Sequence, residues 1–240
     1  MSRPPLASDT AMVMAAGLGK RMRPLTATRP KPLVKVAGKP LIDHSLDRLA
    51  DAGVTRAVVN VHYLADALEA HLGQYKRLGI TVSDERALLL ETGGGLVHAQ
   101  DQLPDPFFCL NSDNIWLDGP RDAFAELSQA WDAERMDALL LLVRHNAAHN
   151  YAGQGDFHLD PLGRVSRRRA RRVAPFIYTG IQLVAKRLLR DAPTGAFSTN
   201  LLWSRAIEEG RLYGCVHTGE WFEVGDPGAI APTEALLTGG

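Results

Sequence analysis

The sequence has few cysteines, no excess charge of either sign and no long apolar run. Cys109 and Cys215, the two cysteines in 240 residues, lie in apolar segments without metal-ligand spacing; this excludes a disulfide framework and indicates a reducing compartment. The 27 basic and 27 acidic residues give no net attraction to nucleic acid or to anionic membranes. No run could span a membrane, and the polar start is not a secretory signal. We therefore expect a cytoplasmic monomer or small homo-oligomer without nucleic-acid or membrane partners.

Apolar strand patterns and helical patterns alternate through the first 150 residues, which predicts βαβ units in a mostly parallel sheet. Short strands dominate after residue 156. We expect a flexible tail over residues 1–9 and a single domain over 10–240, with halves at about 10–150 and 151–240. The predicted strands are 10–16, 57–61, 80–83, 107–111, 138–143, 156–160, 164–168, 173–183, 212–217 and 220–224, and the predicted helices are 40–52, 64–72, 94–102, 120–134, 199–210 and 228–238.

A loop rich in glycine and positive charge follows the first predicted strand. Gly17 and Gly19 lack a Cβ, so their backbone N–H groups can approach a polyphosphate closely. Lys20, Arg21 and Lys31 add positive charge to the same segment. The pattern therefore predicts a loop that binds the phosphates of a nucleotide.

Two better-known glycine loops do not fit this segment. The Walker motif requires Ser or Thr where Arg21 stands, and the dinucleotide fingerprint requires glycine where Met22 stands. The segment Arg21-Met22-Arg23-Pro24-Leu25-Thr26, followed by Lys31-Pro32-Leu33, instead resembles the signature of sugar-1-phosphate nucleotidyltransferases, G-x-G-x-R-[ML]-x-P-L-T and then K-P-[LM].

This resemblance extends from about residue 10 to residue 227. It implies an α/β, GT-A-like (Rossmann-like) fold, in which helices flank a mostly parallel sheet and a small β-rich half binds the sugar, without a left-handed β-helix. It also implies the reaction: a nucleoside monophosphate passes from an NTP to a sugar 1-phosphate, and pyrophosphate is released. The first half of the domain would then bind the nucleotide.

Two segments resemble one type within the family. Glu91-Thr92-Gly93-Gly94-Gly95 and Gly155-Asp156-Phe157 are most similar to the short uridylyltransferases that act on N-acetylmuramate 1-phosphate in cell-wall recycling. This favours UTP as the nucleotide. Two alternative functions remain: a mannose-1-phosphate guanylyltransferase, which uses GTP, and a regulatory homologue that binds a nucleotide sugar without catalysis.

Two acidic residues are the expected ligands of a Mg²⁺ cofactor. Asn111-Ser112-Asp113 follows a buried strand and resembles the family's N-x-D motif, which implies that Asp113 is the first ligand. Trp221-Phe222-Glu223-Val224-Gly225 matches W-x-D-[VIL]-G with glutamate in place of aspartate, which implies Glu223 as the second ligand. Asp226 is an alternative ligand, and Glu223 is otherwise a strand-end acid.

The resemblance assigns the remaining roles. Arg21 is expected at the leaving β- and γ-phosphates and Lys31 at the α-phosphate and the sugar phosphate. Glycines are costly in a packed element, so Gly93 and Gly94 are expected to contact the base. The predicted catalytic residues are Arg21, Lys31 and Asp113; the predicted nucleotide-binding residues are Ala15, Ala16, Gly17, Gly19, Lys20, Arg21, Lys31, Gly93, Gly94 and Asn111; and the predicted sugar-binding residues are Glu91, Asn111, Arg168, Arg169, Gly180 and Asn200.

Each of four features allows two interpretations. Gly180 interrupts a β-rich run, which is typical of a bulge or of a ligand against the backbone. Asn200 suits either a helix N-cap or a sugar hydroxyl, and His62 either the base or a structural contact. The arginine run 164–172 lacks the interleaved aromatics of a nucleic-acid surface; Arg168 or Arg169 would replace a phosphate-binding lysine of the family's E-K-P motif, and the other arginines would be solvated.

Overall fold

The computed structural model describes residues 5–239; residues 1–4 and 240 lie outside the described part. Its strands and helices include every element predicted from the sequence, with boundaries that differ by a few residues. The strands are β1 (Thr10–Met14), β2 (Lys35–Val36), β3 (Lys39–Pro40), β4 (Arg56–Val61), β5 (Gly79–Asp84), β6 (Phe107–Asn111), β7 (Asn114–Leu117), β8 (Ala138–Arg144), β9 (Ala148–His149), β10 (Phe157–Leu159), β11 (Val165–Arg167), β12 (Phe176–Val184), β13 (Leu212–Val216) and β14 (Glu220–Glu223). The α-helices are α1 (Leu41–Ala52), α2 (Ala65–Leu72), α3 (Glu91–Ala99), α4 (Ala123–Ala130), α5 (Asn200–Glu208) and α6 (Ile230–Thr238).

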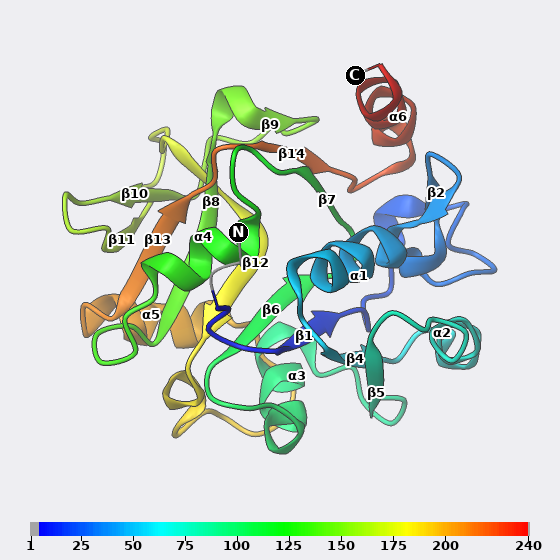
Figure 1. Ribbon diagram of the computed structural model, residues 1–240, viewed down its shortest axis with the longest axis horizontal. Helices are drawn as coiled ribbons and strands as arrows, with labels where there is room; N and C mark the ends of the chain where they lie inside the picture. The colour runs from blue at the N-terminus through cyan, green and yellow to red at the C-terminus, as the bar shows by residue number, and fades with distance from the viewer. Residues whose placement is uncertain (1–4, 240) are drawn as a thin grey trace.

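A nine-stranded mixed sheet forms the centre of the molecule (Figure 1). Strands β6, β1, β4 and β5 are parallel neighbours, while β12 runs antiparallel to β6 and joins β8 and β10. Strand β13 is parallel to β8, so most strands share one direction. The mixed, mostly parallel sheet expected from the sequence is thus present.

Helices cover both faces of this sheet because successive strand residues point to opposite faces. On one face, α1, α2 and α4 pack against residues such as Val13 and Val59. On the other face, α3 and α5 pack against residues such as Met12 and Cys109. The Cys109 thiol is free and buried, and burial raises its pKa to about 12, so it remains protonated and unreactive.

A small second sheet, β7-β14-β9, lies beside the carboxyl end of β6 (Figure 1). Sequence patterns did not predict β7 or β9, because each is short and separated from its partner by many residues. Strand β7 begins three residues after the end of β6 and pairs with β14, so that Glu223 lies opposite Asn114. This pairing brings the end of the chain to the loop that follows β6.

The predicted tail lies partly outside the described residues, since residues 1–4 are not described. From residue 6 onward the chain packs against the domain rather than remaining loose. Leu6 and Ala7 contact the core, and the Ala7 N–H donates to Ser128 Oγ over 3.0 Å. The Asp9 carbonyl accepts from the Thr55 N–H at 2.8 Å. Among the described residues, no helix has the length and apolar character needed to cross a membrane.

Candidate active site

The site lies where β1 and β6 end side by side. Their parallel register pairs Met14 with Asn111, so the glycine-rich loop after β1 and the Asn111–Asp113 segment after β6 emerge together. A cavity of about 440 Å³ opens between them. It collects most of the predicted nucleotide-binding residues: its lining includes Ala15, Ala16, Gly17, Gly19, Lys31, Asn111 and Asp113, together with Glu91, Thr92 and Asn60. The exposed Lys20 is not in this lining.

Gly17 and Gly19 serve the loop in different ways. Gly19 has φ +60°, and a Cβ there would lie 2.9 Å from Lys31 Cβ. Its carbonyl accepts a hydrogen bond from Thr26 Oγ1 at 2.9 Å, which fixes the bend of the loop. A Cβ on Gly17 would meet nothing within 4 Å. Gly19 is therefore required by the protein itself, whereas the space beside Gly17 is open to a ligand.

A buried carboxylate positions the start of this loop. Asn60 Oδ1 accepts from the Ala15 N–H at 2.6 Å, and Asn60 Nδ2 donates to Glu85 Oε1 at 2.8 Å. Glu85 is only 2% exposed, and its other oxygen accepts from the Leu90 N–H at 3.3 Å. In the sequence, the indication of this arrangement is Asn60, a single polar residue inside the apolar strand β4. His62 Nδ1 donates to the Glu85 carbonyl at 2.7 Å and does not line the cavity, which fits its structural reading.

Two ion pairs place opposite charges at the end of β6. Lys31 Nζ lies 2.5 Å from Asp113 Oδ2, and the lysine side chain is only 13% exposed. Arg21 Nη1 lies 3.8 Å from Glu223 Oε1, but the arginine side chain is 73% exposed. Lys31 is therefore fixed in place, whereas Arg21 has the freedom to swing toward a bound anion.

A second cavity, of about 240 Å³, contains both predicted metal ligands. Asp113 and Glu223 line it together with Asp156, a carboxylate to which sequence reasoning gave no role. No group of three or more His, Cys, Asp or Glu side chains in residues 5–239 could hold a metal by itself. Two carboxylates facing one cavity nevertheless fit Mg²⁺, because this ion commonly takes one or two carboxylates and completes its shell with phosphates and water.

Asp226, the alternative metal ligand, has a structural role instead. Its Oδ1 accepts from the Gly228 N–H at 2.8 Å and caps the short 3-10 helix Pro227–Ala229. It does not line the second cavity. The geometry therefore favours Glu223 over Asp226.

Gly180 lies at a bulge of β12, between Tyr178 and Gln182. It has φ +82°, and a Cβ there would lie 2.7 Å from Asn111 Nδ2 and 2.9 Å from Asn114 Nδ2. The bulge and the glycine therefore let β12 approach the end of β6 closely. Gly180 also lines the second cavity, so its predicted contact with a sugar is sterically open.

The glycine run at residues 93–95 differs from expectation. It lies inside the first turns of α3 rather than ahead of a helix, and Gly93 and Gly94 do not line the nucleotide cavity. Their N–H groups both donate to the Phe197 carbonyl, at 2.8 and 3.2 Å. A Cβ on Gly93 would run into the Phe197 ring. The glycines thus allow close packing of α3 against residues 195–197, and the expected base contact has no support from the geometry.

A third cavity, of about 250 Å³, adjoins the first and contains Asn200. Thr199, not Asn200, is the N-cap residue of α5, and neither side chain caps the helix. Sequence reasoning missed most of this lining, because its residues come from strands and helices far apart in the sequence. The lining consists of neutral polar and apolar side chains, namely Met14, Thr92, Cys109, Asn111, Tyr178, Gln182, Ser198, Thr199, Asn200 and Trp203.

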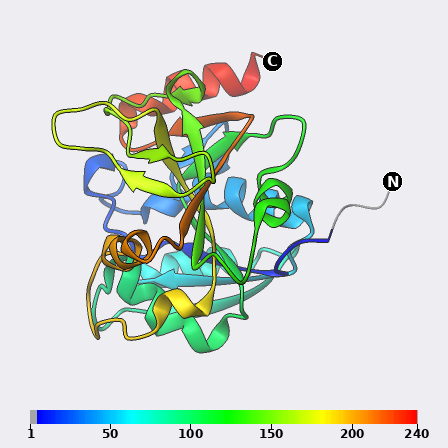
Figure 2. The same ribbon diagram turned by 90° about the vertical axis from the view of Figure 1, so that its left-hand side faces the viewer.

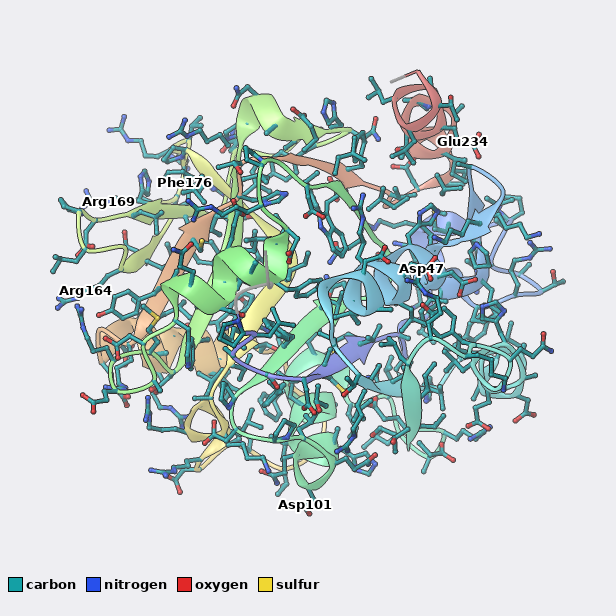
Figure 3. All side chains as sticks on the ribbon, viewed as in Figure 1. Asp47, Asp101, Arg164, Arg169, Phe176 and Glu234 are labelled. Carbon is teal, nitrogen blue, oxygen red and sulfur yellow. The ribbon has the colours of Figure 1, made fainter. Side chains whose placement is uncertain are left out.

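The two arginines expected at the sugar phosphate lie elsewhere. Arg168 donates from Nε to the Gly155 carbonyl at 2.9 Å and from Nη1 to the Arg172 carbonyl at 3.1 Å, so it holds its own hairpin together. Arg169 is exposed at the outer edge of the molecule, like Arg164 (Figure 3). Neither Arg168 nor Arg169 lines any of the three cavities. Strand alternation turned a different residue of the run, Arg167, toward α5.

Comparison with known proteins identifies the family of this chain. A family model described as nucleotidyl transferase matches residues 10–158, which hold the glycine-rich loop, Lys31 and Asp113. The chain belongs to the nucleotidyl transferase family. It is 46% identical over 236 residues to the N-acetylmuramate alpha-1-phosphate uridylyltransferase of Caulobacter vibrioides, with 96% of this chain and 98% of the relative covered. It is 36% identical to the enzyme of that name from Neisseria meningitidis, with 94% and 97% covered.

A solved structure confirms the fold. The inositol-1-phosphate CTP transferase from T. maritima superposes with a TM-score of 0.77 over 97% of this chain and 96% of its own, at 18% identity. The family and the α/β fold expected from the sequence are thus confirmed. This nucleotidyltransferase is a sugar-1-phosphate nucleotidyltransferase, as the sequence motifs predicted.

The packing role of the glycines can be tested by Gly93→Ala. We expect it to lower the free energy of unfolding by about 1–2 kcal/mol, because overpacking against Phe197 costs more than the helix propensity that alanine adds. Gly17→Ala, the matched control, should change stability by less than about 0.5 kcal/mol. Denaturant unfolding of both variants measures the difference. Equal stability of the two variants would refute the packing explanation.

Proposed function

We propose that this enzyme transfers UMP from UTP to N-acetylmuramate 1-phosphate, giving UDP-N-acetylmuramate and pyrophosphate. The observation that supports it most is the place of Asn111, which lines all three cavities at the end of β6. A nucleotide in the first cavity and a sugar in an adjoining one would meet there. The choice of UTP and of N-acetylmuramate rests on the two relatives that bear this activity in their names.

The proposed reaction needs no covalent intermediate. An oxygen of the sugar phosphate attacks the α-phosphorus of UTP, a new P–O bond forms, and the bond from the α-phosphorus to the bridging oxygen breaks. The electron pair leaves with pyrophosphate. The attacking phosphate is already an anion, so no general base is required. Holding two bound reactants in the reactive geometry lowers the activation free energy by about 7–11 kcal/mol in favourable cases. The fixed loop after β1 provides such placement.

Charged side chains offset the charge of the phosphates. We assign Lys31, held at the end of β6, to the α-phosphate and the sugar phosphate. We assign the exposed Arg21 to the β- and γ-phosphates, which leave. Asp113 and Glu223 would hold Mg²⁺, which when bound neutralises phosphate charge and polarises the P–O bonds. Because this stabilisation acts on charge that shifts during the reaction, it would lower the barrier rather than only tighten binding.

The assignment of substrates can be tested by pyrophosphate release. The purified enzyme is supplied with each of four NTPs and with N-acetylmuramate, N-acetylglucosamine, glucose and mannose 1-phosphates. We expect the highest kcat/KM for UTP with N-acetylmuramate 1-phosphate. A preference for GTP with mannose 1-phosphate would replace the proposal by the guanylyltransferase alternative.

Lys31→Ala should lower kcat by several orders of magnitude without unfolding the protein, because Lys31 begins a short 3-10 helix after Pro30 and lines the cavity rather than belonging to the hydrophobic core. The loss should appear in kcat more than in the Kd of UTP. The exposed Lys35 on the same segment provides the control, and Lys35→Ala should leave turnover nearly unchanged. Near-wild-type turnover of the Lys31 variant would contradict its assignment.

Two substitutions at Glu223 distinguish the effect of its negative charge from that of its side-chain length. Glu223→Asp keeps the carboxylate, so activity should stay within about tenfold, which corresponds to about 1.4 kcal/mol, with a shifted Mg²⁺ optimum. Glu223→Gln removes the charge and should be far more damaging. The measurement is turnover across a Mg²⁺ titration. Mild and equal effects of both substitutions would remove Glu223 from the proposed ligand set.

A further inference from the structure

Arg167 connects the β10–β11 hairpin to helix α5, which lies beside the hairpin (Figure 2). Its guanidinium lies 5.8 Å from the centre of the Phe157 ring, on the neighbouring strand β10. Nη1 donates to Asn200 Oδ1 at 3.0 Å, and Nη2 donates to the Asn200 carbonyl at 3.0 Å and to Ser204 Oγ at 3.3 Å. These contacts fix the position of a cation at the start of α5.

The charge of Arg167 has no acidic partner within the described part of the chain. Its hydrogen-bond acceptors, an amide oxygen, a carbonyl and a hydroxyl, are all neutral. Burial lowers the pKa of Arg167, but an arginine this close to the surface remains protonated. A guanidinium has five N–H donors, of which the three bonds above use three. Arg167 therefore offers both charge and donors to an anion.

The acceptor of Arg167 is itself part of the third cavity. Asn200 and Trp203 line this cavity, and Phe157 beneath Arg167 packs edge-on against Trp203 at 6.1 Å. Asn111 belongs to the same lining and to both other cavities. A pyranose whose 1-phosphate lies near Asn111 directs its C3 and C4 substituents away from that residue. The polar and aromatic lining of the third cavity suits a sugar ring. The C3 and C4 substituents of such a ring would then lie on the side of Asn200, to which Arg167 is bonded.

The other arginines of the run do not share this placement. Arg168 is bonded within its own hairpin, and Arg169, Arg171 and Arg172 are exposed without a contact to a residue that lines the cavity. Arg21 lies at the second cavity beside Glu223. Within residues 5–239, Arg167 is thus the arginine bound directly to the lining of the third cavity.

We propose that Arg167 recognises an anionic substituent on the sugar, the carboxylate of a lactyl ether at O3, and so determines sugar specificity. This inference rests on the proposed function, because N-acetylmuramate 1-phosphate carries that carboxylate and N-acetylglucosamine 1-phosphate lacks it. A carboxylate beside the guanidinium forms charge-assisted hydrogen bonds, which are stronger than bonds between neutral groups. N-acetylglucosamine 1-phosphate, which has an uncharged hydroxyl at that position, forms no such charge-assisted bond.

The test compares Arg167→Gln with wild-type enzyme on these two sugar phosphates, with UTP held at saturation. For N-acetylmuramate 1-phosphate we expect kcat/KM to fall about tenfold, through a rise in KM. For N-acetylglucosamine 1-phosphate we expect a change of less than twofold. Arg169→Ala removes one charge from the same hairpin and should leave both values unchanged. Raising the salt concentration should weaken the preference of the wild-type enzyme but not that of Arg167→Gln.

The outcomes separate this inference from the proposed function. Wild-type enzyme that does not prefer N-acetylmuramate 1-phosphate refutes the proposed substrate and, with it, the role of Arg167. Wild-type enzyme with the preference, together with an Arg167→Gln variant that keeps it, overturns the inference alone. An equal loss on both sugars also overturns it, since a residue that only holds Asn200 in place would affect both. Thermal melting of both variants confirms that they fold.

Discussion

The parallel pairing of β1 with β6 determines where the charged groups of the site meet. Its register sets Met14 beside Asn111, and the segments that follow these residues carry Lys31 and Asp113. The 2.5 Å contact between these two side chains joins the glycine-rich loop to the end of β6. The pairing of β14 with β7 then adds Glu223 from the far end of the chain. Two strand pairings thus assemble residues separated by about 200 positions.

The groups behind the site explain its rigidity. A buried Glu85 holds Asn60, which in turn fixes the Ala15 N–H at the first turn of the loop. An unpartnered buried amide would cost about 1–3 kcal/mol and an unpartnered carboxylate more, so these bonds specify one arrangement of the loop. A Cβ on Gly95 would lie 2.8 Å from Glu85 Oε1. The glycine run in α3 and the buried carboxylate are therefore parts of the same packing arrangement.

The sequence predicted the central sheet, its helices and the charged residues of the site, because these depend on local patterns. Gly19 and Asp113 each stand just after a strand end that apolar periodicity identifies, and Lys31 stands in the Lys31-Pro32-Leu33 motif. The sequence did not predict features that depend on contacts between distant segments. Gly93 packs against Phe197, Gly94 against Gly195 and Gly95 against Glu85, and Arg168 bonds its own hairpin. The turn of Arg167 toward Asn200 follows from the register of β10 with β11, which no local pattern reveals.

A crystal structure with Mg²⁺ and UDP-N-acetylmuramate would show whether nucleotide and sugar meet at the end of β6. We expect the pyrophosphate bridge beside Asn111 and Lys31, with the metal on Asp113 and Glu223. The uridine should lie in the cavity lined by Asn60 and Glu91, and the sugar in an adjoining cavity. A diphosphate bound away from Asn111, or a metal that touches neither carboxylate, would refute this arrangement of the site.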